Sequence, residues 1–344
     1  MATPRSTRNL AGIIPPHMLL SIASNQAHVG TPVGKFALAT LATTSNLFNT
    51  RRPHVVGADS SASREVYDAK NGTTRPGTKA RFEGDPAVSD KVVNDAYDFT
   101  GFVRDFYKQV HGRDSIDNHG MKLISTVHYD QGYDNAYWDG SQMTYGDGDG
   151  TIFKSFVILD VCGHEITHGV TQFESNLEYQ DEPGALNESH SDVFGKLIEA
   201  FAKKQTVDKI DWVLGRGIFM PNIKGEGIRN MMHPGTAYDD PSLGKDPQPA
   251  HYKDLYKGWD DNGGVHYNSG IVNRAFALFA TDVGGYAWEK AGVIWYAARA
   301  AAGATPSFAQ FAWHTLDQCA KVNGGAHVQA LKNAWDAVGV VPAK

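Results

Sequence analysis

The chain has 344 residues, of which 41% are hydrophobic and 20% are charged. A chain of this size and composition can bury a large core, and we expect it to divide into two or more compact parts. Its formal net charge of -6 provides no basic face, so we expect no nucleic-acid partner. Two cysteines, Cys162 and Cys319, are too few for a disulfide framework. No apolar run approaches the length of a transmembrane helix, so no membrane partner is expected.

The N-terminal stretch LAGIIPPHMLLSIAS follows Arg5 and Arg8, an arrangement that imitates a signal peptide. Pro15 and Pro16, however, interrupt the apolar run where a signal peptide should be continuous and helix-forming. A conventional signal peptide is therefore the less favoured interpretation. We predict instead that residues 13–20 form a short apolar segment that packs against the rest of the protein.

Residues 24–62 are rich in Ser, Thr, Asn, Ala and Gly, and they end in TRRPHVVGADSSAS, which has the composition of an exposed, cleavable linker. The globular body is expected to begin near Arg64. One long helix is predicted there from the apolar spacing between Val92 and Val110. The segments around it alternate and are rich in aromatic and β-branched residues, which predicts strands and hairpins: REVYDA, KARFEG, KLISTVHY and NAYWDGSQMTYGDG.

After Phe153 the apolar residues recur at helical spacing for the rest of the chain. The predicted helices cover residues 158–174, 187–203, 267–282, 288–301, 308–322 and 327–338. The predicted fold class is therefore α+β, a β-rich half followed by a mainly helical half, with the stretch HEITH at the seam. The predicted organisation is a propeptide and linker at 1–60, a β-rich domain at 61–170 and a helical domain at 171–344.

The stretch HEITH places His164 and His168 four positions apart on a predicted helix. Both imidazoles can therefore point at one metal ion, while Glu165 lies about 100° further round the helix, beside the ion. That is the place required of a base that acts on a water molecule at the ion. The alternative is two histidines with no metal between them, because the motif also occurs by chance.

A catalytic zinc ion usually has three protein ligands, so a third should lie on an adjacent element. Glu188 lies 20 residues after His168 on the next predicted helix, and Asp192 follows one turn later on the same face. We predict that Glu188 binds the ion and that Asp192 orients a ligating imidazole. His190 competes for the ligand role, but it lies about 200° from Glu188 around the helix and should face away.

HEITH followed by NESHSD resembles the gluzincin pattern of the thermolysin family of neutral metalloproteases. The resemblance extends over further motifs in the family's order: YDNAYWDGSQMTYGDGDG, LEYQDEPGALNESHSDVFG, GIRNMMHP and DNGGVHYNSGIVNRAF. The short N-terminal segment with IIPP is similar to the protealysin-type branch, whose precursors keep the enzyme latent with a compact propeptide. The resemblance implies a two-domain zincin fold and a monomeric zinc endopeptidase that acts on polypeptides. It also implies secretion, with a cytoplasmic location as the alternative.

Carried onto this chain, the resemblance implies a zinc ion bound by His164, His168 and Glu188, with Glu165 as the catalytic base. His266 matches the histidine that hydrogen-bonds the oxyanion of the tetrahedral intermediate. The resemblance also implies supporting roles for Asn187, Asp192 and Asp261. The substrate-binding residues that it implies are Asn135, Ala136, Tyr179 and Arg229. Tyr179 also reaches the oxyanion, and for Arg229 a surface salt bridge is the alternative. A lone histidine such as His266 is more often structural, so its role depends on the resemblance.

The bound peptide is expected to add as a further strand beside Asn135 and Ala136. The resemblance also implies a pocket for the side chain that follows the scissile bond. Its apolar lining favours a bulky hydrophobic residue, because burying one contributes about 1.5–3 kcal/mol. The lining residues, which an ordinary core could equally contain, are Phe153, Phe156, Val161 and Ile228.

The family's paired calcium site corresponds here to Asp160, Glu199 and Asp211, but its further glutamate falls on Arg216. A guanidinium cannot bind a cation, so we expect either a single Ca²⁺ or an Arg–carboxylate network in its place. Cys162, two residues before the first zinc-ligand histidine, is interpreted as a small buried apolar side chain rather than a redox or metal group.

We further predict that the propeptide holds the enzyme latent. Cleavage should fall between Asn46 and Ser63, before Leu47 or Val55, where a hydrophobic residue follows the bond. A direct contact of His17 with zinc is a less favoured alternative. Two other functions are alternatives: a catalytically silent zincin that serves as an interaction module, and a hydrolase with a Ser or Cys nucleophile, for which no motif is present.

Overall fold

The computed structural model describes residues 12–49 and 61–344, and its main sheet has the strand order β2-β1-β3-β5-β4. These strands are β1 (Arg64–Asp68), β2 (Thr78–Phe82), β3 (Leu123–Val127), β4 (Ala136–Trp138) and β5 (Met143–Tyr145). Strand β3 pairs in parallel with β1 and β5, whereas β2 and β4 pair antiparallel with their neighbours. In the turn between β4 and β5, the Asp139 carboxylate accepts hydrogen bonds from the backbone N–H groups of Ser141 and Gln142. Strand β4 is an edge strand of this sheet.

Helix α3 (Lys91–His111) connects the β2 strand to β3, and its ends follow from the local sequence. Asp90 accepts hydrogen bonds from the first backbone N–H groups, and Gly112 ends the helix in a left-handed conformation with φ 65°. The predicted helix and the predicted strands are therefore present in this half of the molecule.

Two helices precede the sheet: α1 (Pro16–Ser24) and α2 (Pro32–Asn49). Helix α2 was not predicted, because its threonines gave the segment the composition of a linker. Thr40 and Thr44 instead lie one turn apart on its buried face. There they accept hydrogen bonds from the N–H of Asp134 (3.1 Å) and the side-chain amide of Asn135 (3.4 Å), next to β4.

The remaining helices are α4 (Leu159–Gln172), α5 (Asp181–Ala202), α6 (Asp260–Val283), α7 (Ala291–Ala302), α8 (Phe308–Lys321) and α9 (Val328–Ala337). Three short 3₁₀ helices and two small hairpins connect them: η1 (Val207–Lys209), η2 (Tyr252–Asp254), η3 (Asn323–Gly325), β6 (Val213–Leu214) with β7 (Arg229–Asn230), and β8 (Asp239–Asp240) with β9 (Gly244–Lys245).

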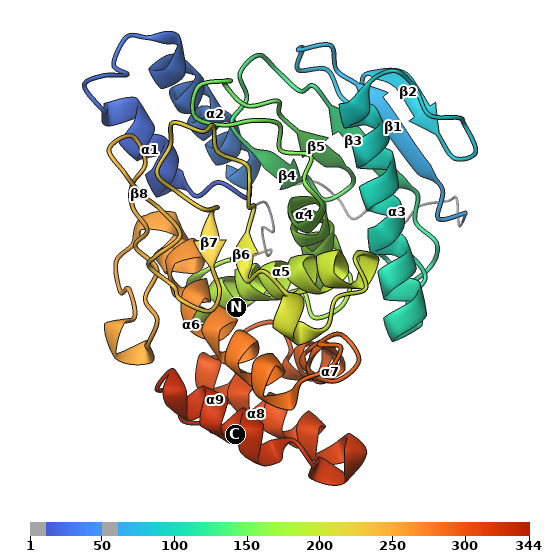
Figure 1. Ribbon diagram of the computed structural model, residues 1–344, viewed down its shortest axis with the longest axis vertical. Coiled ribbons are helices and arrows are strands. Elements are labelled where there is room, and N and C mark those ends of the chain that lie inside the picture. The colour runs from blue at the N-terminus through green and yellow to red at the C-terminus, as the bar shows by residue number, and fades with distance from the viewer. Residues whose placement is uncertain (1–11, 50–60) are drawn as a thin grey trace, which may run out of the picture.

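The molecule has the sheet and α3 at one end and helices α6 to α9 at the other, with α4 and α5 between them (Figure 1). The α+β class and the two-part arrangement are therefore confirmed.

Helix α5 begins at Asp181, six residues earlier than predicted, because a proline in the first turn, Pro183, is compatible with a helix. Helix α6 begins at Asp260 rather than at residue 267, with left-handed residues in its first turns.

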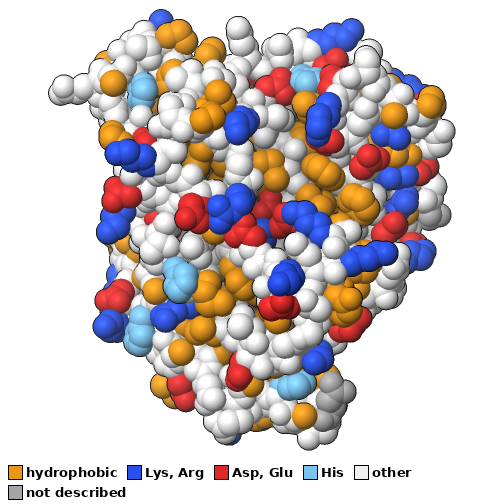
Figure 2. Space-filling model, viewed as in Figure 1, with side chains coloured by type: hydrophobic (Ala, Val, Ile, Leu, Met, Phe, Trp, Pro, Cys, Tyr) orange, Lys and Arg blue, Asp and Glu red, His pale blue; other side chains and the backbone are white. Residues whose placement is uncertain are grey.

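On the face shown in Figure 2, acidic and basic side chains are interspersed, and neither sign of charge dominates. Within residues 12–49 and 61–344, no helix is both long enough and apolar enough to cross a membrane.

Candidate active site

Helices α4 and α5 carry the predicted metal ligands and approach each other closely at two glycines, Gly163 and Gly195. A Cβ atom at Gly195 would lie 2.5 Å from the carbonyl oxygen of Asp160 and 3.2 Å from the backbone nitrogen of His164. Any side chain there would push the helices apart. The glycines therefore allow the contact that brings residues of α5 to the imidazoles of α4.

Within the described part of the chain, one group of potential metal ligands has all its donor atoms within 4.8 Å of one another: His164, His168 and Glu188. The two Nε2 atoms are 3.0 Å apart, and the Glu188 carboxylate lies 3.6 Å from His164 Nε2 and 3.3 Å from His168 Nε2. Zinc with bonds of about 2.0–2.1 Å in tetrahedral geometry separates its ligand atoms by about 3.3 Å. The spacing and the donor types therefore fit a zinc ion.

The other ring nitrogen of each histidine is held by α5. His164 Nδ1 lies 2.8 Å from the Asp192 carboxylate, and His168 Nδ1 lies 2.8 Å from the side-chain oxygen of Asn187. Ser191 Oγ is also 3.1 Å from His168 Nδ1. These contacts turn both Nε2 atoms toward the place of the ion.

Burial lowers the pKa of His164 to about 4, against the opposing effect of Asp192. The ring is therefore neutral near pH 7, which is the form that binds a metal. His190 takes no part in the site, because its Nδ1 lies 2.6 Å from the Leu186 carbonyl oxygen and its ring packs against Phe311.

Glu165 is fully buried beside the ligand group. Its Oε2 accepts a 3.0 Å hydrogen bond from the backbone N–H of Trp138 on β4, and its Oε1 has no hydrogen-bond partner among the described residues. Burial and then the neighbouring Glu188 raise the pKa of Glu165 well above its ordinary value. The charge of a zinc ion would act in the opposite direction and favour the carboxylate.

His266 reaches the ligand group from the first turns of α6. Asp261 and the next three residues have positive φ, so the chain folds back and Asp261 accepts hydrogen bonds from the His266 backbone N–H (2.8 Å) and Nδ1 (2.6 Å). His266 Nε2 consequently lies 3.4 Å from both the Tyr179 hydroxyl and the Glu188 carboxylate. The Tyr179 hydroxyl donates a short hydrogen bond to Glu188. Two polar side chains therefore converge beside the metal ligands.

Arg229 is buried, not a surface side chain. Its guanidinium donates two hydrogen bonds, of 2.8 and 2.7 Å, to Asp192, and Asn273 donates a third, of 2.7 Å. Burial opposes the charged form of Arg229, but Asp192 outweighs it and raises the pKa further above its ordinary value. The charged guanidinium therefore has a fixed position.

The N-terminal segment occupies the place predicted for the peptide beside β4. The backbone N–H of Ile13 donates to the carbonyl of Ala136 (3.1 Å), and its own carbonyl accepts from Arg229 (3.2 Å). Ile14 is bound on both sides by the Asn135 side chain, which accepts from its N–H (2.9 Å) and donates to its carbonyl (3.4 Å). The structure therefore brings Asn135, Ala136 and Arg229 together on one extended segment.

His17 does not join the metal ligands. Its Nε2 lies 3.0 Å from the Tyr238 hydroxyl, and its ring stacks on Tyr267 with centroids 4.7 Å apart.

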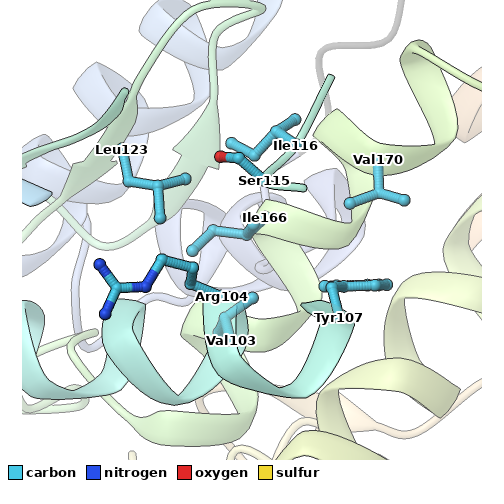
Figure 3. Close-up of a pocket in the computed structure, with 8 residues that line it drawn as sticks. All are labelled: Val103, Arg104, Tyr107, Ser115, Ile116, Leu123, Ile166 and Val170. Carbon is cyan, nitrogen blue, oxygen red and sulfur yellow. The ribbon is translucent and has the colours of Figure 1, made fainter. Parts of the chain in front are cut away.

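A separate small pocket lies on the other side of α4 (Figure 3). It is lined from α4 by Ile166 and Val170, which lie about 200° around the helix from His164 and His168. The rest of its lining comes from α3 and the region around β3: Val103, Arg104, Tyr107, Ser115, Ile116 and Leu123. The pocket therefore lies on the face of α4 away from the imidazoles, and none of its lining residues is a metal ligand.

The acidic residues that correspond to the calcium site contact two cations of the chain. The buried Lys196 ammonium donates to Asp160 (3.2 Å), to the carbonyl of Val213 (3.1 Å) and to Glu199. Arg216 contacts Asp211 and lies 3.0 Å from Glu226. Burial opposes the charge on Lys196, but Asp160 and then Glu199 outweigh it and raise its pKa.

Sequence reasoning missed Ser191, Asn273 and Lys196. Ser191 lies one turn from Asn187 on α5, so the helical spacing of the two residues could have indicated that both face His168. Asn273 and Lys196 gave no such signal, because each is placed by contacts between segments far apart in the sequence. Cys162 is buried, in agreement with its interpretation as an apolar side chain.

The family described as "Thermolysin metallopeptidase, catalytic domain" matches residues 32–172, and "Thermolysin metallopeptidase, alpha-helical domain" matches residues 175–340. The chain is 42% identical over 342 residues to "Extracellular metalloprotease" of Pectobacterium carotovorum subsp. carotovorum, with 97% of each chain covered. It is 46% identical over 299 residues to "Protease PrtS" of Photorhabdus sp. (strain Az29), covering 84% of this chain and 80% of that protein. Among solved structures it is similar to the precursor of protealysin, a metalloproteinase from Serratia proteamaculans. The TM-score is 0.88 at 46% identity, with 96% of this chain and 100% of that chain covered.

A sheet-containing half and a helical half with a buried His/His/Glu group at their seam define a zinc metallopeptidase. The chain belongs to the thermolysin family of metallopeptidases, and it is a zinc endopeptidase. A catalytically silent zincin is not supported, because the matched relatives carry the names of proteases.

Proposed function

We propose that this endopeptidase cleaves on the N-terminal side of bulky hydrophobic residues and is made as a latent precursor that its N-terminal segment inhibits. The observation that carries this proposal is the binding of Ile13 and Ile14 along β4 by Asn135, Ala136 and Arg229. Ile13 and the four side chains expected to line the specificity pocket are all buried. A segment bound there would exclude a peptide substrate from the same place.

In the proposed reaction, zinc supplies a Lewis acid for the scissile carbonyl and lowers the pKa of water. Glu165 accepts a proton from the attacking water and passes it to the departing amine. His266 and Tyr179 donate hydrogen bonds to the oxygen on which negative charge develops. Arg229 and Asn135 hold the peptide backbone that follows the bond. Each of these groups is buried, so the interactions act in a site that excludes bulk water.

Metal removal tests the assignment. Chelation of zinc from the processed enzyme should abolish hydrolysis of a peptide with Leu after the scissile bond, and added zinc should restore it. A matched peptide with Asp at that position should be cleaved poorly by the zinc-loaded enzyme, because a carboxylate would be buried unpaired in an apolar pocket. Equal cleavage of the two peptides would contradict the proposed specificity.

His266→Ala should lower kcat by about 10²- to 10³-fold, because one donor to the developing oxyanion is lost. Substrate binding should change little, since the residues that hold the backbone remain. Steady-state kinetics on the Leu-containing peptide measure both quantities. A rise in KM alone would show that His266 binds substrate rather than the transition state.

Residues 1–60 are proposed as the propeptide, and the predicted cleavage region includes the end of α2. A cut before Leu47 would require the end of this helix to unwind, whereas Val55 lies outside the described residues. Latency predicts that the intact chain hydrolyses an added peptide more slowly than the processed chain. Equal activity of the two forms would contradict latency and leave the protease assignment intact.

Secretion and a monomeric state are also proposed. Secretion is supported by the relative named as an extracellular metalloprotease. Sedimentation of the purified chain would test the monomeric state.

We also propose that the cations of Lys196 and Arg216 take the place of calcium in this chain. Lys196 lies between two of the carboxylates that would bind the ion, and Arg216 contacts the third, Asp211. A calcium ion would have to displace the Lys196 ammonium. Addition of calcium should therefore leave the unfolding midpoint of the protein unchanged.

A further inference from the structure

We propose that the peptide bond between Gly12 and Ile13 is itself a substrate of this active site, so that the chain removes its own residues 1–12 before the linker is cut. The inference rests on the proposed function and names a self-processing site that the linker prediction did not include. It follows from the register in which the N-terminal segment is bound.

The segment runs antiparallel to β4 with a defined pairing. Gly12 lies opposite Tyr137, and the Ile13 N–H bonds to the carbonyl of Ala136. The residue after Tyr137 is Trp138, whose N–H bonds to the proposed base, Glu165. In this register Gly12 lies nearer than Ile14 to Trp138, the β4 residue that contacts Glu165.

The other side of the segment is fixed by Arg229. This side chain donates to the Ile13 carbonyl, and its Nη2 lies 3.9 Å from the zinc-ligand carboxylate of Glu188. Ile13 is therefore held between β4, whose Trp138 contacts Glu165, and Arg229, which lies near Glu188. Ile13 takes the position of the hydrophobic residue that follows a scissile bond.

The side chains suit this register. Ile13 is completely buried, as a hydrophobic residue that follows a scissile bond would be. A Cβ atom on Gly12 would lie 2.5 Å from Nδ2 of Asn135, the side chain that binds Ile14. Glycine therefore lets the segment lie close to Asn135 and keep both hydrogen bonds.

In the proposed step, water adds to the carbonyl carbon of Gly12 and the bond from that carbon to the Ile13 nitrogen breaks. Gly12 keeps a carboxylate, and the Ile13 nitrogen takes the proton that Glu165 accepted from the water. The shortened chain retains the hydrogen bonds of Ile13 and Ile14 and the docked helix α1. This cut alone should therefore leave the enzyme inhibited.

The test mixes the zinc-loaded, full-length wild type with an isotopically labelled Glu165→Gln chain and follows both by intact mass and N-terminal sequencing. We expect the wild type to begin at Ile13 while its linker is still intact, and the labelled chain to keep residues 1–12. The proposal is overturned if the wild type keeps residues 1–12 until its linker is cut, or if both chains lose them at the same rate. Hydrolysis of an added peptide by the processed wild type would show that the protease assignment survives that outcome.

A matched pair of variants tests the register separately. Ile13→Asp should abolish the cut, and Ile13→Leu should retain it. The same substitutions in the inactive Glu165→Gln chain provide a readout that needs no turnover, because bound amides exchange slowly with solvent. Hydrogen exchange of residues 12–20 should become at least about tenfold faster with Asp and stay slow with Leu. Equal exchange in the two variants would contradict the proposed docking of Ile13.

Discussion

Replacement of Glu165 with Gln should lower kcat by about 10²- to 10⁴-fold, while one zinc ion per chain remains bound. The amide preserves the size of the side chain but cannot accept the proton from water. Its oxygen can still accept the hydrogen bond from the Trp138 N–H, so the local structure should persist. The measurement combines peptide kinetics on the processed enzyme with the zinc content of the same sample.

Two controls make this result specific. The zinc ligands are unchanged in the variant, so a loss of zinc would indicate an indirect effect on the metal site. The unfolding midpoint should also stay close to that of the wild type. Near-normal hydrolysis by the zinc-replete variant would show that another group is the base.

Replacement of Lys196 with Gln should destabilise the protein by about 3–5 kcal/mol, because it leaves buried carboxylates without their cation. Asp160 would keep the hydrogen bond from the Gly215 N–H (2.9 Å) but lose its charged partner. The vacated space would be surrounded by Asp160, Glu199 and the Val213 carbonyl, which are oxygen ligands of the kind that calcium prefers. We therefore expect calcium to raise the stability of the variant and not that of the wild type.

The control is Lys203→Gln. Lys203 contacts the same Glu199, but its side chain is 52% exposed. An exposed ion pair contributes about 0–1 kcal/mol, so this substitution should have little effect and create no response to calcium. Urea unfolding of zinc-loaded chains that also carry Glu165→Gln would avoid self-digestion. If calcium stabilised the wild type and Lys196→Gln equally, the Lys196 side chain would not be taking the place of calcium.

The metal ligands could be predicted because their arrangement is mostly local. His164 and His168 share a helix face by spacing alone, and Glu188 with Asp192 repeats the same pattern on the next helix. What spacing could not show is the distance between these helices. That distance depends on Gly163 and Gly195, which lie opposite each other only after the chain has folded.

The structure of the N-terminal region could be predicted only in part. The apolar segment that prolines interrupt indicates docking, but the sequence does not indicate helix α2. The composition of α2 is typical of a linker, and its buried threonines are stabilised by hydrogen bonds to residues about 90 positions away in the sequence. Lys196 was missed for a similar reason, since a lysine in a helix is usually solvated and its carboxylate partner Asp160 belongs to another helix.

The close contact of α4 and α5 also links metal binding to folding. The three zinc ligands come from both helices, and these helices lie between the two halves of the molecule. The ion therefore binds the folded chain far better than an unfolded one, and free zinc at 100 times its dissociation constant would add about 2.7 kcal/mol to the free energy of unfolding. Zinc supply during synthesis would thus determine how much of the precursor survives proteolysis as well as how much of it is active.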